Sequence, residues 1–404
     1  MKIGVKTKIL LAVALAALLG GCVGPRDAEG WSSSQKNQFM KILASDKYAS
    51  ICNERPLYEK VKQSQNSRLM TQLLADYTYN LANSCIDKNT LGDFGAYWQK
   101  VSASDIQRKL RAGQSIEQIL KPYVPEYVQF KLLLAKYRAL QQTPGTSPET
   151  LRKVRLNIER IKLMKPNLGK TYALVNIPEF RVRIIENDKT SIGMGIIVGK
   201  VDHQTPLFSE KLQYIVLNPT WNVPDSIARN EVIPKLLRDP GYLKKHRLVM
   251  RRDYNLDSPA LSPASVNLRA YKGGKGPVPF KFIEVPSDKN ALGRVKFIFP
   301  NHHSVYMHDT PTKYLFKRKV RAYSHGCVRL QDPKLMLKYL TEHYTNYTFA
   351  QAMEKYNSYK THYMKIIKSL PVHTAYLTAY VNEDGILKLF PDIYGFDAKQ
   401  KLNF

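Results

Sequence analysis

A change in residue pattern at Pro166-Asn167-Leu168-Gly169 constrains the fold most. From about residue 35 to 165, apolar residues recur on one helix face, as in the series Leu69, Leu73, Leu74, Tyr77 and Leu81. After the change, short β-branched runs occupy 171–177, 180–186, 191–199 and 214–217. The sequence therefore predicts an α+β fold, with a mostly helical N-terminal region at 35–165 and a β-rich domain at 169–400.

Local signals place several elements within these regions. Ser147 before Pro148 is typical of a helix start, and we expect that helix to run to about Met164. Asp332-Pro333 predicts another start, and a helical pattern covers roughly 349–368. Further strands are expected at 295–299 and 304–307, and a final hairpin joins 375–381 to 386–389 through Asn382-Glu383-Asp384-Gly385.

The segment from about 225 to 290 differs from the strands around it. It is basic and irregular, with Gly273-Gly274-Lys275-Gly276-Pro277 near its centre. We interpret it as an insertion rather than as more sheet. Its function is open between a mobile lid over a site and a passive surface loop.

The N-terminus has the layout of an export signal. Residues 1–8 carry three lysines, residues 9–19 are apolar, and Leu19-Gly20-Gly21-Cys22 follows. The apolar run is too short for a comfortable membrane span. The small residues before Cys22 resemble a bacterial lipobox, which predicts a signal peptide at 1–22, lipid on Cys22 and a tether at 23–34. Val23, in place of the Asp that marks inner-membrane retention, favours the periplasmic face of the outer membrane; the alternative is an ordinary cleaved signal with an incidental Cys.

The remaining cysteines follow from export. In an oxidising compartment paired thiols tend to form disulfides, and Cys52 and Cys85 lie in one predicted helical region where they can pair. Cys327 is then the odd thiol, which indicates a reactive or intermolecular role.

The net charge of the chain excludes few classes of binding partner by itself. Lys and Arg outnumber Asp and Glu by 62 to 33, a net charge of +29. Export and the lack of any RNA- or DNA-binding motif argue against a nucleic-acid partner. Because the lysines are scattered, we interpret the excess as a solvated basic surface near an anionic envelope.

Two histidine-containing elements carry the candidate chemistry. His308, in Tyr306-Met307-His308-Asp309-Thr310, stands nineteen residues before the cysteine of Ser324-His325-Gly326-Cys327. A thiol attacks carbonyls as the thiolate, so it needs a base, and a positioned His supplies one. Gly326 permits a tight turn that can aim backbone N–H groups at an oxyanion.

Two other interpretations remain open at this point. Cys327 can be a small core residue. Alternatively, zinc ligands can come from His302, His303, His308, His325 and Cys327. No Cys-x-x-Cys or His-Glu-x-x-His pattern accompanies them, so we expect no metal.

The run Ser324-His325-Gly326-Cys327-Val328-Arg329, preceded by His308, resembles the YkuD-type L,D-transpeptidases. The common pattern often has Asn where this chain has Arg329, and Arg there resembles the large, YcbB-like Gram-negative branch. Further matches to that branch, within a resemblance covering about 147–398, are 174–178, 218–224, 292–297 and 392–395.

The resemblance implies a sandwich-like, β-rich catalytic domain with 225–290 as a capping insertion. It implies that Cys327 is the nucleophile, that His308 is the general base, and that the Gly326 and Cys327 backbone forms the oxyanion hole. Arg329 would bind a substrate carboxylate. Further pocket candidates are His325, Ser324, Tyr306 and Trp221, the last of which can equally be core. No metal or organic cofactor is expected.

The implied reaction is acyl transfer from a peptidoglycan tetrapeptide stem. The thiol would attack the carbonyl between the L-centre of meso-diaminopimelate and the terminal D-Ala. A second diaminopimelate amine would then resolve the thioester and give a 3→3 cross-link; carbapenems would acylate the same sulfur. Other acceptors would make an L,D-carboxypeptidase, a lipoprotein-anchoring enzyme or a D-amino-acid exchange enzyme. A non-catalytic peptidoglycan-binding lipoprotein is the remaining alternative, but it would lack Cys327 or His308.

The resemblance implies little about the helical region. No peptidoglycan-binding module is recognised there, so the lipid on Cys22 would position the enzyme at the membrane. Residues 35–140 are a reduced scaffold or a partner-binding region, for which cell-wall synthesis proteins are candidates.

Overall fold

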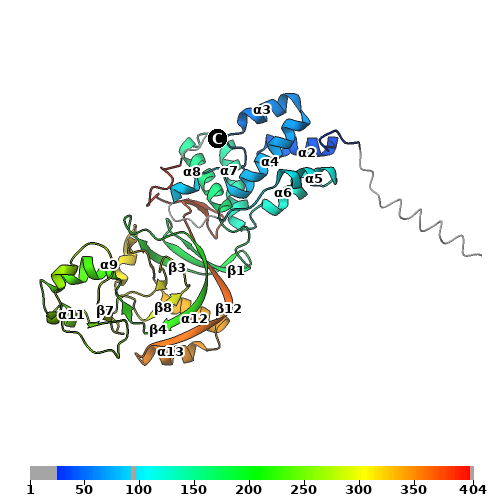
Figure 1. The fold of residues 1–404 in the computed structure, drawn as a ribbon. Helices are drawn as coiled ribbons and strands as arrows, with labels where there is room; N and C mark the ends of the chain where they lie inside the picture. Colours follow the sequence, from blue (N-terminus) through cyan, green and yellow to red (C-terminus); the bar gives the residue numbers. More distant parts are fainter. Residues whose placement is uncertain (1–24, 92–96, 401–404) are drawn as a thin grey trace, which may run out of the picture. The chain divides into compact units, whose positions relative to one another are not determined.

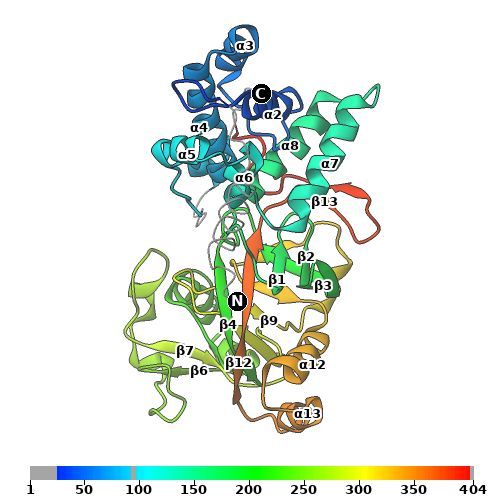
Figure 2. The same cartoon turned by 90° about the vertical axis from the view of Figure 1, so that its right-hand side faces the viewer.

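The computed structural model describes residues 25–91 and 97–400. The predicted signal peptide and Cys22 lie outside this range. The described residues divide into two compact units: 25–88, 97–167 and 399–400 form a helical unit, and 89–91 with 168–398 form a β-rich unit (Figures 1 and 2). The α+β fold class is thus confirmed. No helix in the described ranges is long and apolar enough to cross a bilayer.

The helical unit is built from short amphipathic helices around an aromatic core that includes Phe39, Tyr77 and Phe130. The helices are α2 (Ser33–Ala44), α3 (Arg55–Ser64), α4 (Ser67–Asn83), α5 (Ala103–Arg111), α6 (Ile116–Leu120), α7 (Val128–Gln142) and α8 (Pro148–Lys162), with the 3-10 turn η2 (Lys121–Tyr123). A second 3-10 turn, η1 (Lys88–Leu91), begins in this unit and continues into the β-rich unit.

Helix caps decide where the first and last of these helices begin. Ser147 accepts a hydrogen bond from the N–H of Thr150 at 3.1 Å, which confirms the predicted start of α8. Ser32 forms a capping box at the start of α2, and Trp31 is buried. The tether predicted at 23–34 is therefore wrong for its last residues, because Trp31 anchors them to the core.

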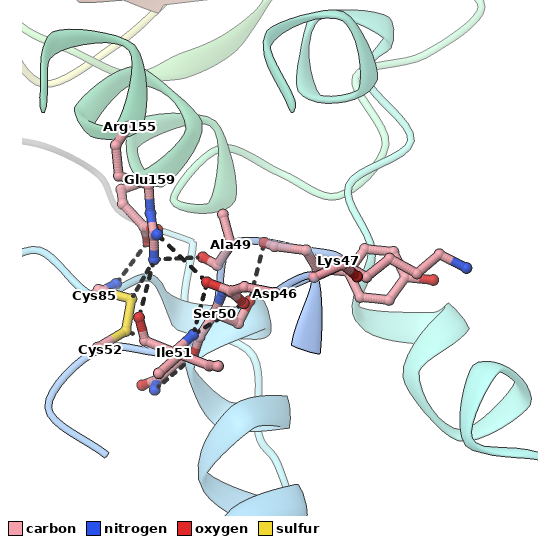
Figure 3. A network of polar contacts seen from close by, with 12 residues as sticks. Asp46, Lys47, Ala49, Ser50, Ile51, Cys52, Cys85, Arg155 and Glu159 are labelled. Atoms are coloured by element: carbon pink, nitrogen blue, oxygen red, sulfur yellow. Dashed lines mark hydrogen bonds and ion pairs between the residues drawn. A yellow bond between two sulfur atoms is a disulfide. The ribbon is translucent and has the colours of Figure 1, made fainter. Parts of the chain in front are cut away.

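Buried charges tie α8 to a disulfide between Cys52 and Cys85 (Figure 3). Glu159 is fully buried and accepts hydrogen bonds from the Cys85 N–H and from Arg155 Nε, each at 2.8 Å, and from Lys162 Nζ at 2.9 Å. Burial raises the pKa of Glu159, but Lys162 and Arg155 outweigh it, and the net pKa is lowered. The carboxylate therefore stays charged and holds the disulfide segment on α8.

The β-rich unit is organised by a sheet of strand order β10-β3-β11-β9-β8-β4-β12-β1-β2, in which β2 also pairs with β3. The pairings thus form a closed circuit, as in a barrel, rather than the two sheets of the expected sandwich. The strands are β1 (Thr171–Asn176), β2 (Arg181–Glu186), β3 (Lys189–Gly199), β4 (Ser209–Leu217), β8 (Val295–Ile298), β9 (Met307–His308), β10 (Ala322–Ser324), β11 (Val328–Leu330) and β12 (His362–Ala375).

The C-terminal part of this unit departs from the expected pattern. Helix α12 (Pro333–Tyr344) begins where predicted, with Asp332 as its N-cap. Helix α13 (Phe349–Asn357) is shorter than the predicted 349–368, because β12 begins at His362. Strand β12 also takes Ala375 from the predicted hairpin, which is reduced to β13 (Ala379–Val381) and β14 (Leu387–Leu389).

The insertion at 225–290 has regular structure, so the expectation of an irregular segment is wrong. With β5 (Trp221–Asn222), it forms a small antiparallel sheet from β6 (Leu248–Arg251) and β7 (Lys281–Glu284). Its helical turns are α9 (Asp225–Ile227), the π-helical η3 (Ala228–Val232), α10 (Ile233–Leu236), α11 (Tyr242–Lys245), η4 (Pro263–Ser265) and η5 (Leu268–Tyr271). Phe280, Phe282 and Met250 are among its own buried core. We call residues 221–284 the cap.

Candidate active site

Cys327 ends the tight turn that connects β10 to β11. Gly326 has φ +111°, a left-handed conformation that favours glycine. The Ser324 hydroxyl bridges the turn: it donates to the Cys327 carbonyl at 2.6 Å and accepts from the Gly326 N–H at 3.1 Å. Ser324 is buried. It therefore shapes the turn, which corrects its expected place among the substrate contacts.

The oxyanion-hole prediction is changed by the same contacts. The Gly326 N–H is engaged by Ser324 and is not free to meet a substrate oxygen. In the described part of the chain the Cys327 N–H donates to no acceptor. One of the two expected backbone donors thus remains available.

The pairing of β9 with β11 brings the two histidine-containing elements together. The strands are parallel, with Met307 opposite Val328 and His308 opposite Arg329. The Val328 N–H also donates to the Tyr306 carbonyl at 3.0 Å. Cys327, the predicted nucleophile, therefore directly precedes β11, and His308, the predicted base, lies on the adjacent strand β9. Nineteen residues separate the two in the sequence.

His308 is suited to accept a proton. Its side chain is buried, and Nδ1–H donates to the Asp309 carbonyl at 2.5 Å, since a carbonyl can only accept. This leaves the lone pair on Nε2. Burial, helped by the nearby Arg329 and Lys296 cations, lowers the pKa of His308 to about 3. The imidazole is thus neutral at neutral pH.

The Cys327 thiol is partly exposed, and its Sγ lies 3.9 Å from the Ser304 carbonyl. Burial raises its pKa above the ordinary value. The Tyr306 N–H and hydroxyl, with the charges of Lys296 and Arg329, oppose this rise and favour the thiolate. The resting groups are therefore a neutral thiol directly before β11 and a neutral imidazole on the adjacent strand β9, and nearby donors and cations favour the thiolate.

Lys296 is a site residue that the sequence reasoning missed. It lies on β8 opposite His308, and its Nζ is 3.8 Å from the centroid of the Tyr306 ring. Burial lowers its pKa, while its interaction with Cys327 acts in the opposite direction. The sequence offered one sign that Lys296 is a site residue: it stands alone between two apolar residues, Val295 and Phe297, both of which are fully buried in the structure.

Arg329 and Trp221 line one cavity of about 240 Å³, together with Thr312 and residues of the cap. Arg329 Nη1 donates to the Thr312 hydroxyl at 3.3 Å. In the described part of the chain Arg329 makes no ion pair with a carboxylate. Trp221 also packs against the cap core, so both of its expected roles are present.

His325 contacts the cap rather than the nucleophile. Its Nε2 lies 2.8 Å from Glu231 Oε1, and its ring meets that of His203 edge-on with centroids 4.9 Å apart. Burial lowers its pKa, and Glu231 acts against this. His325 therefore joins the catalytic turn to the cap. Within 25–91 and 97–400, no three His, Cys, Asp or Glu side chains are grouped so as to hold a metal ion.

Comparison with known proteins shows what the domain that holds this site is similar to. Residues 170–351 match the family model described as the L,D-transpeptidase catalytic domain, YkuD. The chain is 28% identical over 339 residues to the Haemophilus influenzae protein named "Putative L,D-transpeptidase", across 83% of this chain and 67% of that protein.

Solved structures of low sequence identity were also found. The L,D-transpeptidase from Mycobacterium smegmatis is 11% identical, with a TM-score of 0.22 over 51% of this chain and 58% of that chain. L,D-transpeptidase 3 from Mycobacterium tuberculosis, in complex with a faropenem-derived adduct, is 12% identical, with a TM-score of 0.23 over 51% of this chain and 60% of that one. The chain thus spans less than two thirds of the length of these mycobacterial chains.

Proposed function

We propose that this chain, which carries a catalytic domain of the YkuD L,D-transpeptidase family, cross-links peptidoglycan through a thioester on Cys327. The family acts on peptidoglycan stems. In the first stage His308 takes the thiol proton while sulfur attacks the carbonyl between the L-centre of diaminopimelate and D-Ala. The carbon–nitrogen bond then breaks, His308 returns the proton to the D-Ala nitrogen, and the stem remains on sulfur.

In the second stage an amine of another stem replaces the sulfur. The attacking amine loses its proton to His308, the carbon–sulfur bond breaks, and the thiol regains a proton. When that amine is the side-chain amine of diaminopimelate, the product is a 3→3 cross-link.

The observation that carries this proposal is the register between β9 and β11. It brings a buried, neutral His308, whose Nε2 is left as the basic nitrogen, to the strand that leaves Cys327. A neutral base is needed because an imidazolium cannot accept the thiol proton. The neutral resting pair supports a mechanism in which the thiolate forms as attack proceeds.

We assign oxyanion stabilisation to the Cys327 N–H, with the Tyr306 hydroxyl as a second donor. The N–H donates to no acceptor in the described part of the chain, and the Tyr306 hydroxyl acts to lower the pKa of the Cys327 thiol. Two donors near the reacting carbon are the arrangement that acyl transfer requires.

The alternatives differ only in the acceptor. Water would make the enzyme an L,D-carboxypeptidase, a lipoprotein lysine would make it an anchoring enzyme, and free D-amino acids would give exchange. Arg329, in place of the usual Asn, is the feature by which we assign the chain to the YcbB-like branch, and that assignment favours cross-linking. A non-catalytic lipoprotein would not retain both Cys327 and His308.

We further propose export to the periplasm with lipid on Cys22, anchored to the outer membrane. The basis is the sequence layout of residues 1–22 and Val23. The helical unit, with its disulfide, is then a scaffold or a docking region for cell-wall synthesis proteins. Cys52 and Cys85 in a disulfide suit the oxidising compartment that this proposal requires.

Incubation with purified muropeptides followed by mass spectrometry separates these possibilities. Cross-linking predicts a dimer of mass equal to two tetrapeptide stems less one D-Ala, whereas trimming predicts a tripeptide and exchange predicts a stem with a new terminal residue. The Cys327→Ala enzyme is the matched control, because it should keep its fold and form none of these. A 3→3 product from Cys327→Ala would contradict the proposal.

A further inference from the structure

The cavity between the cap and the sheet has a carboxylate and a guanidinium in its lining, and neither forms an ion pair with another residue in the described ranges. Glu284 on β7 and Arg329 on β11 both line it. Its volume of about 240 Å³ is smaller than pockets that hold a whole drug-sized ligand, so it fits the end of a substrate rather than an entire stem.

Glu284 is a buried carboxylate that lacks a counter-ion. Its side chain is 7% exposed, and Oε2 accepts one hydrogen bond, from the Ala291 N–H at 3.0 Å. No Lys, Arg or His in the described ranges lies within ion-pair distance of it. Burial raises its pKa to about 7, and Arg247 offsets this only in part. A bound cation would relieve the cost of keeping this carboxylate charged.

Arg329 is the complementary unpaired group. Its Nη1 has a neutral partner in the Thr312 hydroxyl, and its buried Nε has no hydrogen-bond partner in the described part of the chain. A partly buried guanidinium with a free donor edge is a carboxylate-binding group. The cavity therefore offers one anion and one cation to a ligand.

We propose that this cavity binds the zwitterionic head of an α-amino acid, with Glu284 taking the ammonium group and Arg329 taking the carboxylate. This inference rests on the proposed function, and Glu284 is a specificity-determining residue within it. In a donor stem the matching group is the distal centre of diaminopimelate, which carries both charges on one carbon. A chain of methylene groups separates that distal centre from the scissile carbonyl that Cys327 attacks. The distal centre should therefore bind away from Cys327, which agrees with a cavity lining that includes Arg329 but not Cys327.

The other charged side chains of the cavity do not replace Glu284. Glu231 lies 2.8 Å from His325 and is engaged by it. The exposed Lys289 and His246 also line the cavity, but neither side chain can supply a negative charge. Glu284 is thus the carboxylate of the lining that is left for an ammonium group.

The test compares two tetrapeptide donors in the wild-type enzyme and in Glu284→Gln. One donor contains meso-diaminopimelate, and the other contains 2-aminopimelate, which keeps the distal carboxylate but lacks the ammonium group. Asp257→Asn, which removes an exposed carboxylate of the cap outside the cavity, is the matched control. Wild type and Asp257→Asn should prefer the diaminopimelate donor by at least tenfold in kcat/KM, mainly through KM. In Glu284→Gln the two donors should differ by less than about threefold.

Equal use of both donors by the wild-type enzyme would overturn the inference, and this comparison needs no variant. Retained preference in a folded Glu284→Gln enzyme would overturn it as well. Acylation of Cys327 by a carbapenem, followed by intact mass, separates this failure from failure of the proposed function. The carbapenem should acylate wild type and Asp257→Asn at similar rates; if neither it nor any stem acylates the wild-type thiol, the proposed function and this inference fall together.

A further arm distinguishes the two sources of such a head group. Free meso-diaminopimelate and free D-methionine are added as competitors of the diaminopimelate stem. Competition that is lost in Glu284→Gln would show that the cavity also takes free amino acids, whereas donor preference without competition would show that it takes the head only as part of a stem. Both results support the zwitterion subsite, and competition that persists unchanged in Glu284→Gln would count against it.

Discussion

Replacing Lys296 by Met tests whether a half-buried cation prepares the Cys327 thiol for attack. Lys296 faces the site from β8, opposite His308, with Nζ 3.8 Å from the Tyr306 ring centroid. Its charge lowers the pKa of Cys327, against the rise that burial causes. Methionine keeps most of the side-chain volume while removing the charge, so packing against Tyr306 is largely retained.

The size of the effect follows from the setting of the pair. A nearby opposite charge lowers a pKa by roughly one to three units when the pair is dry. Cys327 is partly exposed, and water weakens the interaction, so the lower end of that range applies. We therefore expect Lys296→Met to raise the pKa of Cys327 further and to lower its thiolate fraction at a fixed pH about tenfold, which corresponds to ~1.4 kcal/mol.

The assay is the rate of iodoacetamide alkylation of Cys327 as a function of pH, followed by intact mass. The wild-type rate should rise with a midpoint above the ordinary cysteine pKa, and the Lys296→Met curve should lie further toward alkaline pH, with about tenfold slower alkylation at a fixed pH below both midpoints. Lys211→Met, which removes an exposed lysine of β4, should leave the curve unchanged. Superimposable curves for wild type and Lys296→Met would refute the electrostatic role and leave Lys296 a packing residue only.

Four further predictions concern the base and the helical unit. His308→Gln should slow carbapenem acylation at least a hundredfold without lowering the thermal midpoint by more than a few degrees, and an unchanged rate would exclude His308 as the base. The pKa of His308 is about 3 in the folded protein and near 6.5 in the unfolded chain, so the folded protein binds fewer protons between these pH values. Urea unfolding should therefore show that the wild-type protein loses stability as the pH falls from 6.5 toward 3. The His308→Gln protein should lose less stability over the same range. Glu159→Gln should lower the unfolding free energy by about 3–5 kcal/mol, since the buried Lys162 loses its ion pair with Glu159; a loss below about 1 kcal/mol would contradict the network. Non-reducing peptide mapping should find Cys52 and Cys85 bridged in exported protein, and two free thiols would contradict the pairing.

Much of the fold could be predicted because its signals are local. The Ser147-Pro148 and Asp332-Pro333 starts are confirmed, since a capping side chain and proline act within one helical turn. Strand β12 was predicted as helix up to residue 368 because no Gly or Pro interrupts 362–368, although Met364 and Ile366 alternate with exposed neighbours. What makes this segment a strand is pairing with β4 and β1, which are distant in the sequence.

The catalytic pair could be predicted because its residue types are rare and chemically specific. Cys327 and His308 stand in recognisable runs, and the sheet register brings those runs together. Lys296 and Glu284 could not be predicted as site residues from the sequence, because Lys and Glu in a basic chain ordinarily face solvent. Glu284 is buried and Lys296 is half-buried only because strands distant in the sequence pack around them, which the local sequence of β7 or β8 does not encode. The engaged Gly326 N–H likewise depends on the rotamer of Ser324, which no spacing rule specifies.

The most direct test of the central claim is to trap the stem on the enzyme. Wild-type protein and Cys327→Ala are mixed with a diaminopimelate tetrapeptide without acceptor, quenched in acid and examined by intact mass and peptide mapping. The wild-type enzyme should gain the mass of the stem less D-Ala, on the peptide that contains Cys327, and hydroxylamine should remove it as it does a thioester. Cys327→Ala should gain nothing. An adduct on another residue, or release of D-Ala by Cys327→Ala at the wild-type rate, would contradict the assignment of Cys327 as the nucleophile.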